Sequence, residues 1–377
     1  MPRDADESNV VVDAQRLGDA QRSDTRSTGD SMPALLQGVG DTHPPIMART
    51  VVASDTMTTF WQGRRVVVTG GAGFLGRVVV AKLAALGADV MVPRSRDFDL
   101  TVSGVAERLL AEARPTHIVH LAARVGGIGY NQAEPAPLYL SNLLMGTHII
   151  EAARTAPGVE KTVLLGTVCS YPKFTPVPFR EESLWDGYPE ETNAPYGIAK
   201  KAHLIHAQVN HQQYGQKFAY LIPTNLYGPG DKFHPSVSHV IPARIKRCVE
   251  AKEQNEQKID VWGTGRASRE YLYVEDAADG IVLAAERYEG SEPVNLGNNR
   301  EVTIRETVEL IATMVGYDGE LVWDPTKPDG QPRRRVDAGR AEARFGWRAT
   351  MPFEEGLRNT IDWYLANRAE AERQPSG

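Results

Sequence analysis

The chain has 377 residues, 41% of them hydrophobic, and a formal net charge of −6, as in an ordinary soluble globular protein. The negative charge argues against a nucleic-acid or membrane-surface partner, and no apolar run reaches the roughly 18 residues of a membrane span. The two cysteines, Cys169 and Cys248, make neither a disulfide framework nor a CxxC metal motif. We therefore expect a reducing compartment, with the cytoplasm as the location.

Residues 1–56 differ in composition from the rest of the chain. They are rich in Asp, Arg and Ser, and they contain no aromatic residue and no sustained hydrophobic period. Such a segment cannot bury enough apolar surface to offset its ordering entropy. We expect a disordered extension over 1–56, with Met57 as the more plausible start of the protein.

From Arg64 onward, short β-branched runs alternate with amphipathic stretches of helical length. The predicted strands are "RRVVVTG", "ADVMVPR", "HIVHLAA", "KTVLLGT" and "FAYLIPT", and the predicted helices are 74–86, 102–113, 137–156 and 196–214. This alternation predicts an α/β fold with a doubly wound parallel sheet of the Rossmann type. We expect a dinucleotide-binding domain over 62–225, to which some later segments return. A smaller mixed α/β substrate-binding lobe is expected over 226–377.

A glycine motif follows the first predicted strand. In "TGGAGFLG", Gly70, Gly73 and Gly76 have the spacing G-x-x-G-x-x-G and open the first predicted helix. The first glycine permits a tight turn, the second lets the backbone approach a pyrophosphate, and the third allows close helix–strand packing. The helix N-terminus offers free N–H groups to the anion. The strand–turn–helix context favours a dinucleotide site over a purely structural turn.

The end of the second predicted strand bears on the choice of dinucleotide. A carboxylate there would hold the ribose of NAD, whereas an arginine favours the 2′-phosphate of NADP. The segment "VPRSRDFDL" places Arg94 and Arg96 first, which favours NADP over a merely solvated charged turn. Asp99, before Leu100, is expected to line the adenine pocket.

Tyr196 and Lys200 lie four residues apart at the start of a predicted helix, so their side chains share one face. A lysine ammonium beside a phenol favours the phenolate and lowers its pKa. The pair can exchange a proton with a carbonyl or alcohol oxygen while a nicotinamide exchanges a hydride. This motif after the fourth strand of a dinucleotide-binding sheet resembles the extended short-chain dehydrogenase/reductases.

The resemblance extends to one particular family within that class. The chain from about Arg65 to the C-terminal helix is similar to the GDP-L-fucose synthase family, on the segments "GTVCSYPK", "EETNAPYGIAKKA", "IPTNLYGPGDKFHPSVSHVIPA", "VWGTGRASREYLYVEDAA" and "KPDGQPRR". The family inverts carbons 3 and 5 of a GDP-linked 4-keto-6-deoxyhexose and then reduces the ketone. The chain departs from the family at Thr167 and Val168, where serines are usual, and in "TGGAGFLG", where "GHRGMVG" is more usual.

The resemblance implies roles for individual residues. Cys169 matches the family's base and His239 its acid, while Thr167 keeps a hydroxyl before the cysteine. Tyr196 and Lys200 complete the catalytic set. The implied NADP(H) contacts, beyond those named above, are Phe74, Leu75, Leu100, Ala122, Pro223, Asn225, Leu226 and His239. The implied nucleotide-sugar contacts are Asn193, Arg247, Trp262, Arg269 and Lys327, in which cationic groups clamp the diphosphate and the indole offers a flat wall.

Several alternatives remain open. A sugar-nucleotide 4,6-dehydratase would need carboxylates at the positions of Val168 and Cys169, and a simple 4-epimerase would need neither Cys169 nor His239. A reductase without epimerase activity fits the departure at Val168. A cofactor-sensing or scaffold protein built on the same sheet can lose the Tyr–Lys pair, and the retention of that pair here argues against this alternative. His234 is interpreted as structural, and His203 and His206 lack further zinc ligands, so no metal is predicted. The class is often dimeric, and we expect a homodimer.

Overall fold

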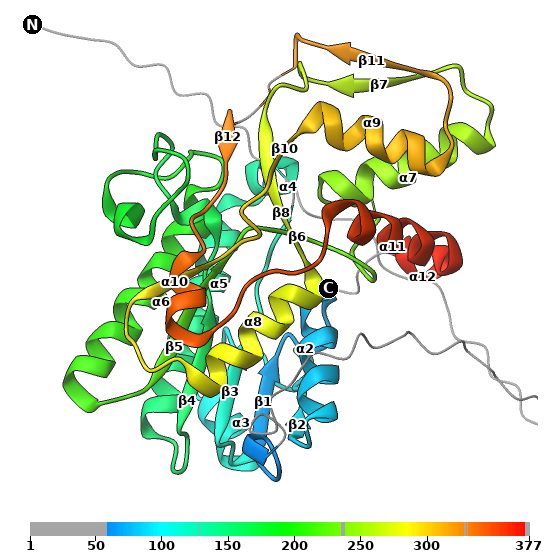
Figure 1. Cartoon of the computed structure of the whole chain (residues 1–377). Helices are drawn as coiled ribbons and strands as arrows, with labels where there is room; N and C mark the ends of the chain where they lie inside the picture. Colours follow the sequence, from blue (N-terminus) through cyan, green and yellow to red (C-terminus); the bar gives the residue numbers. More distant parts are fainter. Residues whose placement is uncertain (1–58, 127, 235–237, 328, 330, 374–377) are drawn as a thin grey trace, which may run out of the picture. The chain divides into compact units, whose positions relative to one another are not determined.

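The computed structural model describes residues 59–126, 128–234, 238–327, 329 and 331–373. The predicted extension over 1–56 lies outside these residues. Figure 1 shows a central sheet with helices on both of its faces and a second group of strands and helices beside it. No described helix combines the length and the apolar character that a membrane crossing requires.

The central sheet is parallel and has six strands, as the alternating pattern predicts. Its strands, in spatial order, are β2 (Asp89–Met91), β1 (Arg65–Thr69), β3 (His117–His120), β4 (Lys161–Leu165), β5 (Phe218–Pro223) and β9 (Pro293–Leu296). The strand order reverses at β1, which is where a doubly wound sheet opens a crevice for a ligand. The predicted α/β class and the doubly wound sheet are confirmed.

Two layers of helices cover the sheet. One layer contains α2 (Phe74–Ala85), α8 (Val274–Arg287) and α10 (Gly339–Phe345); the other contains α3 (Val105–Ala113), α5 (Pro135–Thr155) and α6 (Ala194–Tyr214). The short helix α4 (Ile128–Ala133) precedes α5, and the turns η1 (Val168–Ser170) and η2 (Glu181–Trp185) follow β4. Buried Val, Ile, Leu and Ala side chains fill both helix–sheet interfaces, because a parallel sheet must be covered on both faces.

The helix α3 begins three residues later than the pattern predicts, at Val105 rather than Val102. The carboxylate of Asp99 accepts hydrogen bonds from the backbone N–H and the hydroxyl of Thr101, which favours a turn over a helix at this point. Gly104 then has a left-handed backbone with φ of 81°. The helix can therefore begin only after this glycine.

The second group of elements has its own apolar core. Its strands are β6 (Asn225–Tyr227), β7 (Lys258–Trp262), β8 (Ser268–Tyr273), β10 (Glu301–Thr303), β11 (Glu320–Asp324) and β12 (Arg333–Arg334), and its helices are α7 (Val240–Glu253), α9 (Ile304–Val315), α11 (Phe353–Ala366) and α12 (Arg368–Ala371). β8 lies between β10 and β12 and also pairs with β6, while β7 pairs with β11. Aromatic rings of Tyr227, Tyr271 and Phe353 pack against one another in this core.

The packed core begins near the first described residues. Trp61 is fully buried, and its ring meets those of Phe60 and His117 edge to face. The guanidinium of Arg64 lies over the ring of Phe60. These contacts attach residues 60–64 to the sheet.

We predict that a chain starting at Met57 folds and unfolds like the full chain, because it keeps Phe60 and Trp61. A chain starting at Gln62 loses the buried indole and is expected to lose about 3–5 kcal/mol of unfolding free energy, the usual range for removing a large buried side chain. Urea denaturation of the three chains measures this difference. A clear loss of stability in the Met57 chain would show that residues 1–56 contribute to the fold.

Candidate functional site

The glycine motif forms a turn that only small residues can make. Gly70 has φ of 72°, and a Cβ there would lie 2.7 Å from the backbone nitrogen of Ala122; a Cβ on Gly76 would lie 2.1 Å from the carbonyl oxygen of Gly70. Gly73 is the N-cap of α2, and no side chain caps this helix. The first turn of α2 can thus offer its backbone N–H groups to an anion. This arrangement fits the pyrophosphate of a dinucleotide.

The predicted cofactor residues Phe74 and Leu75 form the first turn of α2, directly after Gly73. Ala122 follows β3, and its backbone N–H donates to the hydroxyl of Thr69 at the end of β1. Since β1 and β3 are adjacent parallel strands, these residues meet at one edge of the sheet. Pro223 ends β5 at the same edge.

The segment after β2 carries the predicted specificity residues. Arg94 and Arg96 are exposed, and Arg96 contacts only the neighbouring carboxylate of Asp97 among the ion pairs of the described residues, at 3.4 Å. The two hydrogen bonds from Thr101 lower the pKa of Asp99, so this residue is an ionised turn former. Leu100 is buried in the core under α3.

The cysteine turn lies against the first turn of α6. The hydroxyl of Thr167 accepts a hydrogen bond from the backbone N–H of Cys169 (3.2 Å), which closes η1. The hydroxyl of Ser170 donates to the carbonyl of Gly197 (3.0 Å), and a Cβ on Gly197 would lie 2.6 Å from the carbonyl oxygen of Cys169. The glycine next to Tyr196 therefore allows the backbone of Cys169 to approach the tyrosine helix.

Val168, the position that departs from the resembled family, points away from this contact. Its side chain is 4% exposed and packs in an apolar cluster with Leu164, Tyr171 and Phe179. A hydroxyl at this position would be buried among apolar groups at a cost of about 1–3 kcal/mol without a partner. The valine thus fits the core, whereas Thr167 supplies the hydroxyl beside Cys169.

Tyr196 and Lys200 lie together on α6, with Lys200 Nζ 5.8 Å from the centre of the tyrosine ring. Lys200 is 1% exposed, and desolvation lowers the pKa of its ammonium to about 8. The prediction that Lys200 lowers the pKa of Tyr196 is wrong for this arrangement. Burial, and secondarily the Cys169 sulfur, raise the pKa of Tyr196 well above its ordinary value. The phenol therefore keeps its proton and can donate it.

His239 is the N-cap residue of α7. The residue as a whole is exposed. Protein atoms nevertheless crowd around the imidazole, so that desolvation, and secondarily the charge of Lys232, lowers the pKa of the ring. A lowered pKa makes the imidazolium a stronger acid and leaves the ring mostly neutral at neutral pH. Among the described residues, no hydrogen bond or ion pair joins His239 to Cys169 or Tyr196, and residues 235–237 before it lie outside the described part.

The predicted substrate residues fall into two groups. Near the catalytic turn, Asn193 precedes α6 and accepts a hydrogen bond from the amide of Asn131 (3.2 Å). Arg269 on β8 donates to the carbonyls of Ser268 and Gln331 (2.7 Å each), and burial lowers its pKa to about 10.

The other group lies on the second group of strands and helices (β6–β8, β10–β12, α7, α9, α11 and α12), which we call the second lobe. Trp262, at the end of β7, is 66% exposed, and Lys327 Nζ lies 5.5 Å from the centre of its ring. An exposed indole beside an ammonium group can offer a flat surface and a charge to a nucleotide. Arg247 on α7 instead forms an ion pair with Glu256, so it would have to leave that partner to bind a diphosphate.

Two further predicted cofactor residues lie on β6. Asn225 donates its side-chain amide to the carbonyl of Glu270 (3.0 Å), and Leu226 is half-buried beside it. The hydrogen bond of Asn225 ties β6 to β8. These residues therefore have a clear structural role at the junction between the sheet and the second lobe.

Arg334 is a residue of the site that the sequence did not predict. This residue lies on β12, and its Nη1 donates to Cys169 Sγ at 3.7 Å. The signal was present in "KPDGQPRR", which drew attention only to Lys327. The contact joins residues 165 positions apart in the chain, which no local pattern reveals.

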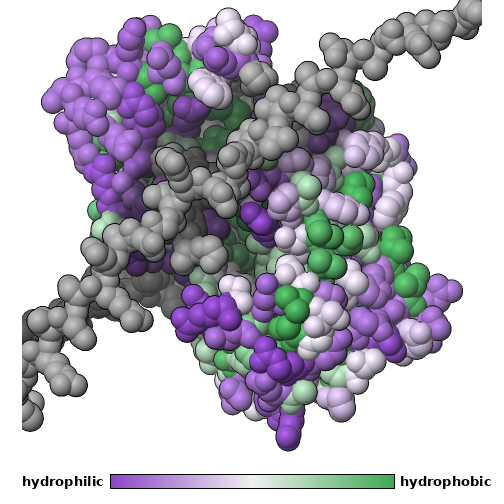
Figure 2. All heavy atoms as spheres, turned by 180° about the vertical axis from the view of Figure 1, so that it is seen from behind, coloured by the Kyte–Doolittle hydropathy of each residue, from purple (hydrophilic) through white to green (hydrophobic). Residues whose placement is uncertain are grey.

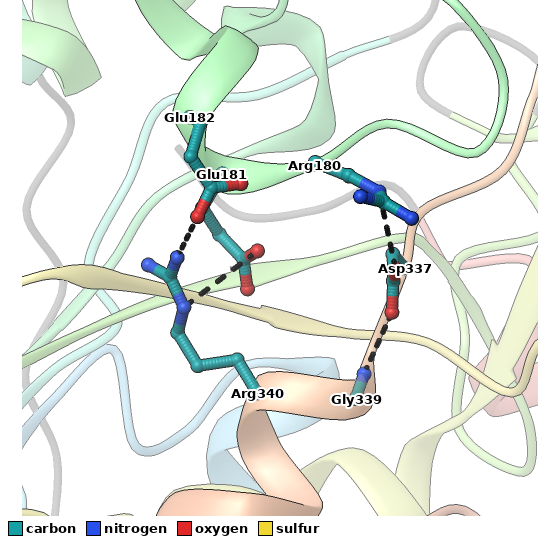
Figure 3. Close-up of a pocket in the computed structure, with 6 residues that line it drawn as sticks. All are labelled: Arg180, Glu181, Glu182, Asp337, Gly339 and Arg340. Carbon is teal, nitrogen blue, oxygen red and sulfur yellow. Dashed lines mark hydrogen bonds and ion pairs between the residues drawn. The ribbon is translucent and has the colours of Figure 1, made fainter.

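A separate recess of about 300 Å³ lies beside η2 and α10, lined by Arg180, Glu181, Glu182, Asp337, Gly339 and Arg340. Figure 3 shows its charged side chains pointing at one another. Arg180 pairs with Asp337 at 3.5 Å, and Arg340 pairs with both glutamates. Because two arginines face three carboxylates here, the recess lacks the excess positive charge of an anion site. It contains none of the predicted catalytic residues.

No metal cluster is found in the part of the chain that the structure describes: no three His, Cys, Asp or Glu side chains lie close enough together to hold an ion. Of the histidines considered for zinc, His203 is buried and its Nε2 donates a hydrogen bond to the carbonyl of Leu143 (3.1 Å), and His206 lies 3.6 Å from Glu151. Both contacts hold α6 against α5.

Comparison with known proteins gives a consistent result. Residues 66–297 match the NAD dependent epimerase/dehydratase family. The chain is 40% identical to GDP-L-fucose synthase 1 of Arabidopsis thaliana, with 85% of this chain and 99% of the relative covered. It is 39% identical to GDP-L-fucose synthase of Escherichia coli strain K12, with 81% and 98% covered.

Among solved structures, a GDP-L-fucose synthetase from Naegleria fowleri bound to NADP is 29% identical, with a TM-score of 0.74 over 82% of this chain and 94% of that one. The likeness thus extends over nearly the whole described part, which includes the glycine turn, the Cys169 turn and the Tyr196–Lys200 pair. The chain belongs to the NAD dependent epimerase/dehydratase family and, within it, to the GDP-L-fucose synthases.

Proposed function

We propose that the protein is an NADPH-dependent enzyme that inverts carbons 3 and 5 of a GDP-4-keto-6-deoxyhexose and then reduces its 4-keto group. The observation that carries this proposal is the packing of the Cys169 turn on the Tyr196 helix at Gly197. This contact places a potential carbon base beside a potential reductase acid. The names of the relatives from Arabidopsis thaliana and Escherichia coli support the same reaction.

NADPH would lie at the edge of the sheet where β1, β3 and β5 end. The backbone at Gly70, Gly73 and Gly76 leaves room for its pyrophosphate, and the exposed Arg94 and Arg96 would bind its 2′-phosphate. When bound, the cofactor supplies the hydride for carbon 4. The residues over 62–225 would form most of this half of the enzyme, and those over 226–377 most of the sugar-nucleotide half.

In the epimerase step, the thiolate of Cys169 removes a proton from the carbon next to the ketone. The C–H bond breaks, an S–H bond forms, and the electron pair moves onto the ketone oxygen as an enolate. His239 then delivers a proton to the opposite face of the same carbon, which inverts it. This pair of proton transfers occurs once at carbon 3 and once at carbon 5. The hydroxyl of Thr167 holds the turn that carries the sulfur.

In the reductase step, Tyr196 donates its phenolic proton to the oxygen at carbon 4. The raised pKa of Tyr196 keeps that proton in place until the oxygen gains negative charge. Lys200, whose pKa is lowered to about 8, is largely charged at neutral pH and stabilises the phenolate that forms.

The substrate's nucleotide would lie on the second lobe. Trp262 and Lys327 offer an exposed aromatic face and a cation, and Arg247 could exchange Glu256 for a diphosphate oxygen. Arg269 and Asn193 lie closer to the catalytic turn and would contact the sugar end.

The proposal includes a homodimer and a cytoplasmic location. Leu140 on α5 and Ile205 and Val209 on α6 are about half exposed, and α5 and α6 pack against each other. Figure 2 shows that green hydrophobic patches interrupt the largely hydrophilic surface seen from behind. Paired helices with exposed apolar residues fit a two-fold helical interface. The free thiols of Cys169 and Cys248 agree with a reducing compartment.

Cys169→Ser and Tyr196→Phe should separate the two steps. The serine hydroxyl is nearly the same size as the thiol but several pKa units less acidic. We therefore expect deuterium uptake from heavy water into carbons 3 and 5 to fall at least about 100-fold, the scale of a lost general base. Tyr196→Phe should keep that uptake while NADPH oxidation falls by a similar factor. Product NMR and absorbance at the NADPH band measure the two rates.

Cys248→Ser is the matched control, since Cys248 is buried in the second lobe and should leave both rates near wild type. If Cys169→Ser takes up deuterium at the wild-type rate, Cys169 is a core residue and the protein is a reductase only. If NADPH oxidation survives Tyr196→Phe, another group donates the proton.

The choice of cofactor can be tested at the segment after β2. We expect NADPH to have a higher kcat/KM than NADH, because two exposed guanidinium groups can bind the 2′-phosphate. Changing both Arg94 and Arg96 to Ser should lower kcat/KM for NADPH about 10–100-fold, as for the loss of charged hydrogen bonds, and leave NADH nearly unchanged. An equal or higher kcat/KM for NADH in the wild type would exclude the arginine assignment.

Substitutions that introduce charge on the exposed face of α6 test the proposed dimer. Ile205→Glu together with Val209→Glu should convert a dimer into a monomer in sedimentation velocity, because unpaired charges in an apolar interface are costly. Val102→Glu, at an exposed position before α3, is the control and should stay dimeric. A wild-type protein that sediments as a monomer at micromolar concentration would contradict this part of the proposal.

A further inference from the structure

Arg334 is in direct contact with the sulfur atom that the proposed mechanism uses. Its Nη1 donates to Cys169 Sγ at 3.7 Å, a normal length for a hydrogen bond to the large sulfur atom. The same side chain is anchored at its other nitrogen, since Nε donates to the amide oxygen of Gln331 (3.1 Å). The guanidinium group is therefore held in a fixed orientation between Gln331 and Cys169.

The backbone that carries Arg334 is fixed on both sides. Before it, the carbonyl of Pro332 accepts a hydrogen bond from the backbone N–H of Ser268 (2.9 Å); after it, the carbonyl of Arg335 accepts one from Phe179 (2.7 Å). The backbone N–H of Val336 donates to the carboxylate of Glu270 (2.8 Å), a residue with no exposed surface. We call residues 331–337 the strap.

The strap is also tied at its C-terminal end. The side-chain amide of Asn295 donates to the carbonyl of Asp337 (3.1 Å), and the carboxylate of Asp337 pairs with Arg180 at 3.5 Å (Figure 3). Asn295 in turn accepts from the hydroxyl of Tyr171 (2.7 Å), two residues after Cys169. The strap and the cysteine turn are thus bound to the same buried amide.

The other charged or titratable groups near the sulfur have different partners. Arg269 is next to Arg334, in register across β8 and β12, but it directs Nη1 to the carbonyls of Ser268 and Gln331. Tyr196 approaches from α6 and is held in its neutral form by burial. Arg333 points elsewhere and pairs with Glu301.

We propose that Arg334 is a further catalytic residue of the epimerase step, which orients the sulfur of Cys169 and stabilises its thiolate. This inference rests on the proposed role of Cys169 as the carbon base. A cation beside a thiol favours the anion, and an N–H donor fixes the direction from which the sulfur lone pair meets the C–H bond. When the sulfur takes up the proton, Arg334 keeps its own protons, so no step needs an added reactant.

The chemical reactivity of Cys169 tests the proposal without substrate or cofactor. The full chain is treated at neutral pH with iodoacetamide, an uncharged reagent that attacks thiolates, and peptide mass spectrometry follows each cysteine. Cys248 serves as an internal reference, because it is 1% exposed and burial raises its pKa to about 11. Iodoacetamide attacks the thiolate, so its rate reports how a neighbouring group such as Arg334 affects the reactivity of the sulfur.

We expect Arg334→Gln to slow alkylation of Cys169 about tenfold and Arg334→Lys, which keeps the charge, to stay within about threefold of wild type. Arg333→Gln is the control on the same strand and should react at the wild-type rate. Deuterium uptake into carbons 3 and 5 should fall in the same order, whereas the KM for NADPH should not change. Slower alkylation of Cys248 is not expected in any variant.

Wild-type alkylation of Cys169 in a folded Arg334→Gln protein would overturn the proposal. Equal slowing in Arg334→Gln and Arg334→Lys would also overturn it, because the effect would then come from the altered shape of the strap. A protein in which Cys169→Ser keeps full deuterium uptake would refute the proposed function, and that outcome is separate from the alkylation result.

Discussion

The backbone of the cysteine turn reaches the first turn of α6 at Gly197, and the proposed chemistry depends on this approach. A side chain at position 197 would collide with the carbonyl of Cys169, and the hydroxyl of Ser170 bonds to the glycine carbonyl from the same turn. The backbone that carries Cys169 is therefore held against the first turn of the helix that carries Tyr196. Because η1 follows β4 of the central sheet and α6 packs against that sheet, this geometry is built into the core.

A second set of residues reaches the same place from the far end of the chain. The strap over 331–337 crosses beside η1 and is held by Glu270, Phe179 and Asn295. It adds a positive group, Arg334, to a turn whose own residues, Thr167 to Tyr171, carry no charged side chain. The central sheet thus supplies the glycine cradle and the Tyr–Lys pair, and the second lobe supplies the charge beside the cysteine.

The sequence predicts the fold well because its signals are local. Alternation of β-branched runs with helical stretches predicts five of the six strands of the central sheet, and the glycine spacing predicts the turn at β1. The sixth strand, β9, was assigned to no element, since it is a four-residue strand from the later part of the chain. The start of α3 was misplaced because a side-chain turn at Asp99 and a left-handed Gly104 outweigh the helical pattern.

Individual residues of the candidate site could be named from the sequence only where they belong to a recognisable motif. The environment of each group could not be predicted in the same way: the pKa of Tyr196 rises because of burial, which depends on packing between distant segments. The role of Val168 as a core residue likewise follows from the cluster around it. Arg334 was missed because its partner lies 165 residues away.

If one site both moves protons at carbons 3 and 5 and reduces carbon 4, a single product must carry both changes. Incubation of the full chain with GDP-4-keto-6-deoxymannose and NADPH in heavy water, followed by NMR of the product, detects them together. We expect a product that is inverted and deuterated at carbons 3 and 5 and reduced at carbon 4, with one NADPH oxidised per molecule. A reduced product that carries no deuterium at either carbon would contradict the epimerase role of Cys169.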